Sequence, residues 1–369
     1  MQALIISCVL IFGFVSPCLC LRWNVVGTKN TYDVMAYGAH GDGKSDDSQA
    51  FLSAWKNTCE AEGASTLVIP RGKVFMVNSI TLIGNCKATS IHIQISQLIT
   101  ISYVNGLTID GGGLIYGHGS DWWLCRTCPR PRLLGFHSCN NLRVSNLSIT
   151  NSPGGHISIN GCNGATFSHL NIHAPPDSPN TDGIDISASK NVLIEDSAIG
   201  TGDDCIAING GCSYINATRI ACGPGHGISI GSLGRNGIHE TVEEVYVKNC
   251  SINGTTNGAR IKTCPGGSGY ARKITFEQIT LIKAHNPILI DQYYNDVVKV
   301  SEVTYRGFEG TSADEQAINL NCSSLGCFNL VLDQINIVSS QPGKKTYASC
   351  NNAHGIVGST TPRVSCLLK

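Results

Sequence analysis

Four short polar motifs between residues 180 and 262 carry residue types that could do acid–base chemistry. In chain order they are Asn180-Thr181-Asp182, Gly202-Asp203-Asp204, Gly225-His226-Gly227 and Arg260-Ile261-Lys262. Successive motifs are separated by about 21, 23 and 34 residues, which are repeat lengths typical of a solenoid. Neighbouring strands of a stack lie about 4.8 Å apart, so this spacing predicts that three carboxylates, an imidazole and two cations converge on one patch. Such a patch suits the hydrolysis of an acidic polymer.

The aspartates of these motifs fit the two-carboxylate chemistry of glycosidic bond hydrolysis. One carboxyl must stay protonated as a general acid, and another must be ionised as a base or nucleophile. Crowding Asp182, Asp203 and Asp204 together would raise the pKa of one of them and so separate the two roles. Because adjacent residues of a flat strand face opposite ways, Asp203 and Asp204 are expected at a bend. Taken alone, Gly-Asp-Asp is usually a solvated turn, and the neighbouring motifs are what favour the catalytic interpretation.

His226 and the two cations complete the candidate site. The glycines on both sides of His226 indicate a close approach of the backbone, as a ligand site requires, although a tight turn with an incidental histidine is the alternative. Arg260 and Lys262 alternate around Ile261, so both face outward if Ile261 faces the core. Beside a carboxylate cluster these cations are candidates for binding a substrate carboxylate, Arg260 by a bidentate pair.

The elements that must position these motifs are short strands arranged in a repeat. From Leu107 onward a pattern of three apolar residues recurs. Two residues separate the first apolar residue from the second, and one residue separates the second from the third, as in Val144, Leu147 and Ile149. Copies of this repeat begin at Val144, Phe167, Ile194, Ile215, Val247, Phe276, Tyr305 and Leu332. The offset between copies, roughly 21 to 32 residues, is a solenoid period, and stacking the copies would bury one continuous core. We predict an all-β, single-domain, right-handed parallel β-helix over residues 21–369. A β-sandwich is the alternative, disfavoured because two-residue Asn-Gly or Asp-Gly hairpin turns do not punctuate the strands.

The amino-terminal part contains a predicted secretory signal and a predicted helix that covers the end of the solenoid. Residues 1–20 read as a secretory signal, with an apolar segment from Leu4 to Val15 followed by small residues and Pro17. A short helix is expected over residues 47–59, where apolar residues recur at helical spacing, and it would shield the open end of the solenoid. No later stretch reaches the run of about 20 apolar residues that a transmembrane helix needs. We therefore expect a secreted protein of the extracellular space or cell wall, without a membrane partner.

Composition and cysteine usage narrow the function classes further. The net charge is +0 and only 14% of residues are charged, so no global field would attract nucleic acid or a membrane surface. Of the 18 cysteines, Cys8, Cys18 and Cys20 lie in the signal; the other fifteen, in an exported chain, imply disulfides and at least one thiol left over. Candidate glycosylation sites follow from sequons at Asn146, Asn216, Asn249, Asn253 and Asn321.

Two other motifs are weaker than they look. Cys125-Arg126-Thr127-Cys128 has the spacing of metal ligands but no second matching pair, so a loop disulfide or two unpaired thiols are favoured over zinc. Gly227-Ile228-Ser229-Ile230-Gly231 matches the nucleophile elbow of serine hydrolases, but no helical pattern follows it as that motif requires. Neither motif therefore redirects the interpretation, and no metal is expected.

With these residues in place, the chain resembles the plant polygalacturonases, a family of pectin-cleaving glycoside hydrolases, over nearly all of the mature chain. Further matching segments are Tyr37-Gly38-Ala39, Ser178-Pro179, Cys222-Gly223-Pro224, Gly231-Ser232-Leu233-Gly234, Asn286-Pro287 and Asp291-Gln292-Tyr293-Tyr294. The resemblance implies a right-handed β-helix that hydrolyses α-1,4 bonds between galacturonic acid units of homogalacturonan. It also implies inversion at the anomeric carbon and action outside the cell without a cofactor. We expect the protein to be a monomer.

The resemblance assigns a role to each residue of the acidic cluster. Asp203 is similar to the family's proton donor to the leaving oxygen. Asp182 and Asp204 are similar to the pair that activates the attacking water. His226 would tune the protonation of the cluster.

The same resemblance assigns substrate contacts and disulfides. Arg260 and Lys262 would hold the galacturonate carboxylate beside the bond that breaks, and Tyr294 is similar to a tyrosine that the family places at the cleft. The family pattern pairs Cys205 with Cys222, Cys322 with Cys327, and Cys350 with Cys366, and Cys59 with Cys86 is a further candidate pair.

The chain departs from the family pattern in two segments, which keeps alternatives open. It is short near Ile91–Val104 and Asn295–Ser301, and Asn295 stands where the family commonly has a cysteine. A catalytically silent wall-binding or allergen-like homologue is one alternative. A pectate lyase or a rhamnogalacturonan hydrolase on the same scaffold is another, although Arg260 and Lys262 speak against the latter. The motifs do not separate endo from exo attack, because that depends on the loops that close the cleft.

Overall fold

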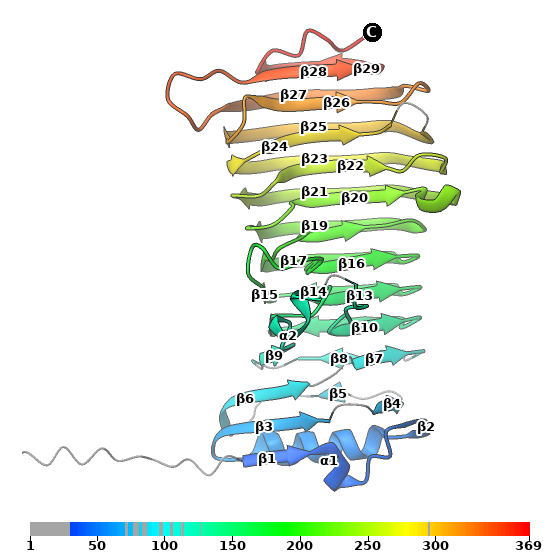
Figure 1. The fold of residues 1–369 in the computed structure, drawn as a ribbon, viewed down its shortest axis with the longest axis vertical. Helices are drawn as coiled ribbons and strands as arrows, with labels where there is room; N and C mark the ends of the chain where they lie inside the picture. Colours follow the sequence, from blue (N-terminus) through cyan, green and yellow to red (C-terminus); the bar gives the residue numbers. More distant parts are fainter. Residues whose placement is uncertain are drawn as a thin grey trace, which may run out of the picture.

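The computed structural model describes residues 30–70, 73–76, 81–82, 87–95, 99–103, 106–110, 112, 114–125, 127–293 and 296–369. These residues form one continuous stack of parallel strands, with an amino-terminal helix at one end and the carboxyl terminus at the other (Figure 1). The fold is a right-handed parallel β-helix, as the sequence repeat predicts. The β-sandwich alternative is wrong, because the strands of both long sheets pair with parallel neighbours one coil away.

Two long sheets form the walls of the stack within the described residues. The first, with 18 strands, contains β1 (Asn30–Asp33), β3 (Gly63–Ile69), β5 (Thr81–Leu82), β6 (Ala88–Ile95), β8 (Thr108–Ile109), β9 (Leu114–Tyr116), β11 (Leu142–Ser145), β12 (Ser148–Thr150), β14 (Asn163–Ser168), β15 (Asn171–His173), β17 (Lys190–Gly200), β19 (Cys212–Cys222), β21 (His239–Asn253), β23 (Ser268–Ala284), β25 (Val297–Ser312), β27 (Cys327–Ser339), β29 (Ala353–Val357) and β30 (Thr360–Thr361). The second, with 10 strands, contains β7 (Ile99–Ser102), β10 (Leu134–His137), β13 (Ile157–Asn160), β16 (Ile184–Ser187), β18 (Ile206–Ile208), β20 (Ile228–Leu233), β22 (Asn257–Thr263), β24 (Asn286–Asp291), β26 (Gln316–Asn321) and β28 (Tyr347–Asn351). Strands β2 (Asp42–Asp46) and β4 (Val74–Met76) form a separate pair.

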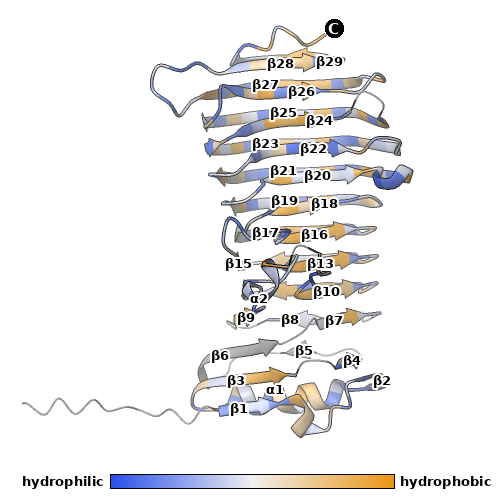
Figure 2. Ribbon diagram, in the orientation of Figure 1, coloured by the Kyte–Doolittle hydropathy of each residue, from blue (hydrophilic) through white to orange (hydrophobic). Residues whose placement is uncertain are grey.

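The core lies between these sheets and is built from columns of stacked apolar side chains. In the ten-stranded sheet Ile208 pairs with Ile230, and Ile230 pairs with Ile261, each fully buried. Alternate residues of a strand face opposite sides, so the positions that alternate with these isoleucines lie on the outer face of the sheet. The apolar colouring of β10, β13 and β16 in Figure 2 follows this pattern. One face of each strand is thereby committed to the core and the other is available for a site.

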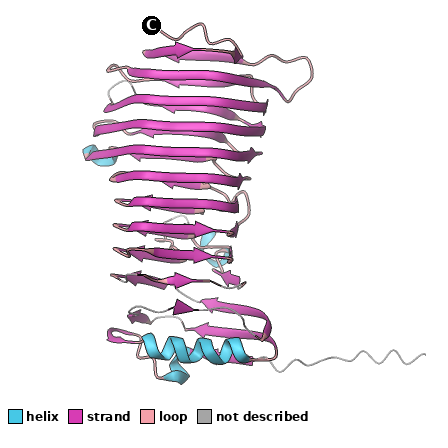
Figure 3. Ribbon diagram, turned by 180° about the vertical axis from the view of Figure 1, so that it is seen from behind, coloured by secondary structure: helices cyan, strands magenta, loops and turns pink. Residues whose placement is uncertain are grey.

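Helix α1 (Ser48–Glu60) lies across the amino-terminal end of the stack (Figure 3). Its buried side chains include Phe51, Ala54 and Trp55, which confirms the predicted capping helix to within one residue. The short helix α2 (Ser120–Trp123) and the 3-10 turns η1 (Val34–Tyr37) and η2 (Arg235–Gly237) were not expected. Elements of three or four residues give no periodic pattern from which they could be predicted.

The disulfides between described residues close short loops of the chain, with sequence separations of 3 to 17 residues. They join Cys125 with Cys128, Cys205 with Cys222, Cys322 with Cys327, and Cys350 with Cys366. The motif at Cys125 is therefore a loop disulfide. Buried thiols remain at Cys162, Cys212 and Cys250, and Cys264 is a half-buried thiol, in line with the expected surplus of cysteines.

Several predictions from sequence fall outside the described residues. These are the signal over residues 1–20, Cys86 with its pairing to Cys59, and Tyr294. In the short segment after Asn295 the stack continues, because β25 pairs with β23 on one side and β27 on the other. No helix of the described chain combines the length and apolar character needed to cross a membrane.

The column of stacked isoleucines gives the first prediction. Replacing Ile230 by alanine is expected to lower the free energy of unfolding by about 2 to 5 kcal/mol, because the cavity left between two coils cannot collapse. Ile282→Ala makes the same chemical change at a side chain that is 44% exposed, and it is expected to cost less than about 0.5 kcal/mol. Denaturant unfolding followed by circular dichroism measures both, and equal losses would contradict this account of the core.

Candidate active site

The candidate site lies on the outer face of the ten-stranded sheet, where β16, β18 and β20 begin. Ile184 pairs with Ile206, and Ile206 pairs with Ile228. Asp182 lies two residues before Ile184, and Asp204 and His226 hold the same position in the next two coils. The register therefore brings these three residues to one level of successive coils. Asp203 and Asp204 sit at a bend, as expected from the need for both to reach the cleft.

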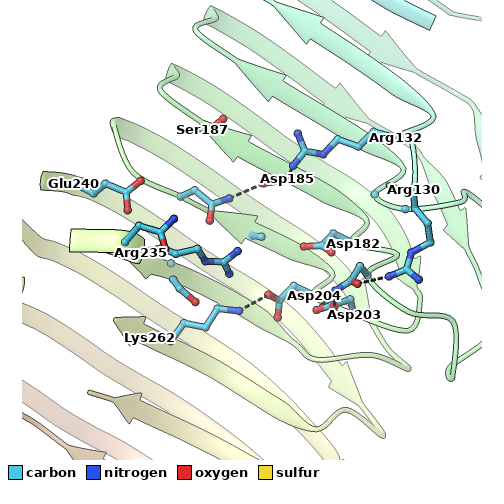
Figure 4. A pocket seen from close by; sticks show the side chains of 18 of the residues that line it. Arg130, Arg132, Asp182, Asp185, Ser187, Asp203, Asp204, Arg235, Glu240 and Lys262 are labelled. Atoms are coloured by element: carbon cyan, nitrogen blue, oxygen red, sulfur yellow. Dashed lines mark hydrogen bonds and ion pairs between the residues drawn. The ribbon is translucent and has the colours of Figure 1, made fainter. Parts of the chain in front are cut away.

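A cleft of about 630 Å³ opens over this level of the sheet (Figure 4). Charged side chains dominate its lining, and they are Arg130, Arg132, Asp182, Asp185, Asp203, Asp204, Arg235, Glu240 and Lys262. All of the aspartates of the predicted cluster and one predicted cation thus share a single cavity.

Asp204 is the most enclosed of the three predicted aspartates, at 1% exposure. Its Oδ1 accepts hydrogen bonds from Ser229 Oγ at 2.7 Å and from Arg260 Nη2 at 2.8 Å. Its Oδ2 accepts one from Lys262 Nζ at 3.1 Å. Arg260 Nε also donates to Ser229 Oγ at 2.9 Å. Two cations therefore compensate one buried carboxylate, which is the condition under which a buried charge is tolerated.

Asp203 is paired with His226. Oδ1 of Asp203 lies 2.9 Å from Nδ1 of His226 and also accepts the backbone N–H of Asp204 at 2.8 Å. Burial alone would raise the pKa of Asp203, but the hydrogen bond and charge of His226 outweigh it and lower that pKa. The same hydrogen bond raises the pKa of His226 against the opposing effect of burial. The pair is thus stabilised as carboxylate and imidazolium.

Asp182 has the opposite electrostatic environment. Its carboxyl group makes no hydrogen bond to another side chain of the described residues, and burial, followed by the charges of Asp203, Asp204 and Asp185, raises its pKa to about 8. Asp182 therefore holds a proton at neutral pH while Asp203 is ionised. Two carboxyl groups with pKa values shifted in opposite directions are what acid–base hydrolysis requires.

His156 supports the backbone of Asp182 from behind the cleft. Its backbone N–H and its ring Nδ1 both contact the Asp182 carbonyl oxygen, at 2.7 Å and 3.0 Å. Burial lowers the pKa of His156 to about 4, so the ring is neutral and Nδ1 carries the hydrogen that it donates. The histidine fixes the level at which Asp182 enters the cleft.

Sequence reasoning missed several polar residues of the cleft. Asp185 accepts from Arg132 Nη2 at 2.7 Å and from Asn209 Nδ2 at 2.5 Å. Asp185 lies between the buried Ile184 and Ile186, and Ser229 has the same place between two buried isoleucines of β20, so strand alternation was a signal that could have found both. Ser229 was noticed only within the rejected nucleophile-elbow motif. No local signal marks Arg132, because its loop is distant in sequence from the four motifs.

Other predicted residues lie elsewhere or remain outside the described chain. Tyr294 is not among the described residues, whereas its neighbour Tyr293 is 60% exposed. One ligand atom each from Asp203, Asp204 and His226 lies within 4.8 Å of the others, so this trio could hold a cation such as calcium or zinc. The existing contacts to Arg260 and Lys262 already compensate the Asp204 charge in that position.

The sequons differ in how accessible they are. Asn216, Asn249 and Asn253 are exposed on the 18-stranded sheet, whereas the amide of exposed Asn146 donates to Asp110 Oδ1 at 2.7 Å. Asn321 is half-buried and donates to Gln292 O at 2.9 Å. The first three positions are therefore the most open to a glycan, and glycosylation itself stays a prediction.

The fold and this cleft define the class of the protein: a parallel β-helix with a cleft that contains several carboxyl groups, as glycoside hydrolysis would require. A sequence profile of glycosyl hydrolases family 28 matches residues 59–366. The chain is similar to a probable polygalacturonase of Arabidopsis thaliana, with 46% identity over 371 residues that cover 92% of this chain and 81% of the relative. A polygalacturonase of Persea americana is 40% identical over 386 residues, covering 93% and 82%. The chain belongs to glycosyl hydrolases family 28.

Solved structures share the fold. The endo-xylogalacturonan hydrolase of Aspergillus tubingensis aligns with a TM-score of 0.68 and 26% identity, covering 89% of this chain and 99% of that one. The exopolygalacturonase of Thermotoga maritima aligns with a TM-score of 0.64 at 18% identity, covering 90% and 92%. These alignments place the described stack among carbohydrate-cleaving β-helices.

The raised pKa of Asp182 gives a prediction about stability. The pKa of Asp182 is about 8 in the folded state, whereas its ordinary value is 3.8. Between pH 3.8 and pH 8 the folded protein therefore binds one proton that the unfolded chain does not. Its contribution to stability is therefore complete below pH 4 and is lost as the pH rises to 8. Asp182→Asn cannot ionise, so at pH 8 it is expected to be more stable than the unmodified protein by at least about 1 kcal/mol.

Thermal unfolding between pH 4 and pH 8 tests this expectation, with the difference between the two proteins vanishing toward pH 4. Asp314→Asn, at an exposed position, is the matched control and should not show the trend. A pH dependence identical for Asp182→Asn and the unmodified protein would mean that Asp182 is already ionised in the folded state at neutral pH.

Proposed function

We propose that this protein is a polygalacturonase, which hydrolyses the α-1,4 bonds between galacturonate units of homogalacturonan with inversion. The observation that carries the proposal is a single cleft in which Asp182, Asp203 and Asp204 lie together with the cation of Lys262, while Asp203 is hydrogen-bonded to His226. Membership of glycosyl hydrolases family 28 and the relatives named polygalacturonases support the same substrate. Disulfides in the chain support action outside the cell, where they persist.

In this proposal Asp203 donates the proton to the leaving oxygen, and Asp182 and Asp204 position and deprotonate the attacking water. Inverting hydrolysis places the acid and base on opposite faces of the sugar ring with room for water between them. The proton that Asp203 delivers comes from its hydrogen bond with Nδ1 of His226, which makes the histidine its proton reservoir. Asp182 is protonated in the free site, so it acts as the base only after its proton has passed to bulk water.

Lys262 and Arg260 make different contributions to substrate binding in this proposal. The ammonium group of Lys262 has three N–H donors, and one of them binds Asp204. Lys262 also lines the cleft, where its other donors can bind the carboxylate of a sugar unit. Arg260 directs Nε and Nη2 to Ser229 and Asp204, and its side chain is only 14% exposed. Its main part is therefore to hold Asp204 in place. We infer that the protein acts as a monomer without a cofactor.

Removing the carboxylate of Asp203 tests the assignment. Asp203→Asn is expected to slow the release of reducing ends from polygalacturonate by roughly 10² to 10⁴-fold, with little change in the unfolding temperature. Asp314→Asn serves again as the matched control and should keep the full rate. An Asp203→Asn enzyme with the rate of the unmodified protein would remove Asp203 from the mechanism.

A second substrate distinguishes the proton donor from the base within the cluster. The substrate is an aryl galacturonide whose phenolate is a good leaving group and departs without being protonated. Loss of the proton donor should hardly affect this substrate, whereas loss of the base should slow it until azide replaces the water. We expect the first behaviour for Asp203→Asn and the second for Asp182→Asn and Asp204→Asn. If Asp182→Asn shows the first behaviour instead, Asp182 is the donor, as its resting proton would allow. Elimination products that absorb in the ultraviolet would identify a lyase, and binding of oligogalacturonate without cleavage would identify a silent homologue.

A further inference from the structure

The cations of the cleft differ in whether a carboxylate already occupies them. Arg260 and Lys262 both contact Asp204, and Arg132 contacts Asp185. For Arg130 and Arg235, which line the same cleft, no acidic side chain of the described residues lies within ion-pair distance. These two arginines are therefore the guanidinium groups of the cleft that can bind an anion without first giving up an acidic partner.

Arg130 is held against the catalytic carboxylates by a short relay. It lies in the loop that links α2 to β10, and its Nη1 reaches the carbonyl of Cys125 at 3.5 Å. Its Nη2 donates to Asn180 Oδ1 at 2.5 Å, and Asn180 Nδ2 donates in turn to Asp203 Oδ2 at 3.3 Å. The guanidinium thus stands two hydrogen bonds away from Asp203, with its remaining N–H groups available.

Arg235 enters the cleft from the other side, as the first residue of η2 after β20. Gly234 before it has φ of 82°, and its N–H donates to Glu240 Oε2 at 2.7 Å. A Cβ on Gly234 would lie 2.6 Å from Gly267 Cα, so the turn is packed tightly against the next coil. Figure 4 places Arg235 on one side of Asp182, Asp203 and Asp204 and Arg130 on the other. The backbone at Arg235 is fixed while its side chain has no partner among the described residues.

We propose that Arg130 and Arg235 are specificity-determining residues that bind the carboxylates of two different galacturonate units from opposite walls of the cleft. This inference rests on the proposed function and names the form of substrate that the site requires. Successive units of a 1,4-linked chain are rotated relative to one another, so their carboxylates face different walls. A guanidinium binds a carboxylate through two parallel hydrogen bonds. A methyl ester has no charge and cannot form that pair, so the polymer must be unesterified at both positions.

The two arginines on the floor of the cleft, Arg260 and Arg132, cannot provide the same selection. A substrate carboxylate that took Arg260 from Asp204 would leave a buried carboxylate with one cation fewer, which is costly. Arg132 would have to leave Asp185 in the same way. The wall arginines meet no such cost, and so among the arginines of the cleft they are the ones that distinguish free from esterified units, in addition to the contact proposed for Lys262.

The test compares Arg130→Ala, Arg235→Ala and the double variant with the unmodified protein. On unesterified polygalacturonate each single variant is expected to raise KM by about tenfold with kcat nearly unchanged, since each loses one charge-assisted contact made in the ground state. A highly methyl-esterified pectin offers these arginines no free carboxylate, so the unmodified protein should bind it weakly and the variants should bind it with the same Kd. Arg130→Lys and Arg235→Lys restore a charge and should recover part of the affinity.

Arg143→Ala is the matched control, because Arg143 is exposed on β11 of the other sheet, and it should leave both the KM and the Kd unchanged. The Kd for trigalacturonate, measured by calorimetry with unfolding temperatures checked, gives a readout that does not need turnover. Values of KM and Kd for both alanine variants within about twofold of the unmodified protein would overturn the inference. An unmodified protein that binds trigalacturonate but releases no reducing ends would refute the proposed function alone, and the Kd values would still decide the role of the arginines.

Discussion

The whole site depends on the in-register hydrogen bonding of β16, β18, β20 and β22. Ile184, Ile206, Ile228 and Ala259 form one buried column across these strands. A slip of one residue in any strand would exchange its inward and outward faces and would carry a side chain of the proposed site away from the cleft. The apolar columns oppose such a slip, because each isoleucine would have to leave the core. Precision in the site is thus a consequence of packing in the interior.

Gathering three carboxyl groups in one enclosed cleft is electrostatically unfavourable, and the structure resolves it in three ways. Asp204 is compensated by Arg260 and Lys262, Asp203 is paired with His226, and Asp182 keeps its proton. Each solution leaves its carboxyl group in a different protonation state or with a different partner. The differences are what allow neighbouring groups of the same chemical type to take different parts in a hydrolytic reaction.

The sheet and the loops contribute different parts of the site. The ten-stranded sheet positions Asp182, Asp204 and His226, because the hydrogen-bond register between its strands fixes which residues lie side by side in successive coils. The walls of the cleft come from the loop that carries Arg130 and Arg132 and from the turn that carries Arg235. Loops of this kind can change without disturbing the core, so the choice of polymer can vary while the reaction centre stays the same.

The sequence by itself determined the winding, the capping helix and the gathering of Asp182, Asp203, Asp204 and His226, because a repeat of apolar positions fixes both the inward face and the coil length. It could not place Arg130 or Arg235, since loop residues carry no period. Only the tertiary structure decided which cations contact a carboxylate of the protein: the guanidinium of Arg260, which was predicted to bind the substrate, contacts Asp204 and Ser229. The tertiary structure also decided which carboxyl group retains a proton. Burial and the distances between charges set the pKa, and neither of them can be obtained from the sequence.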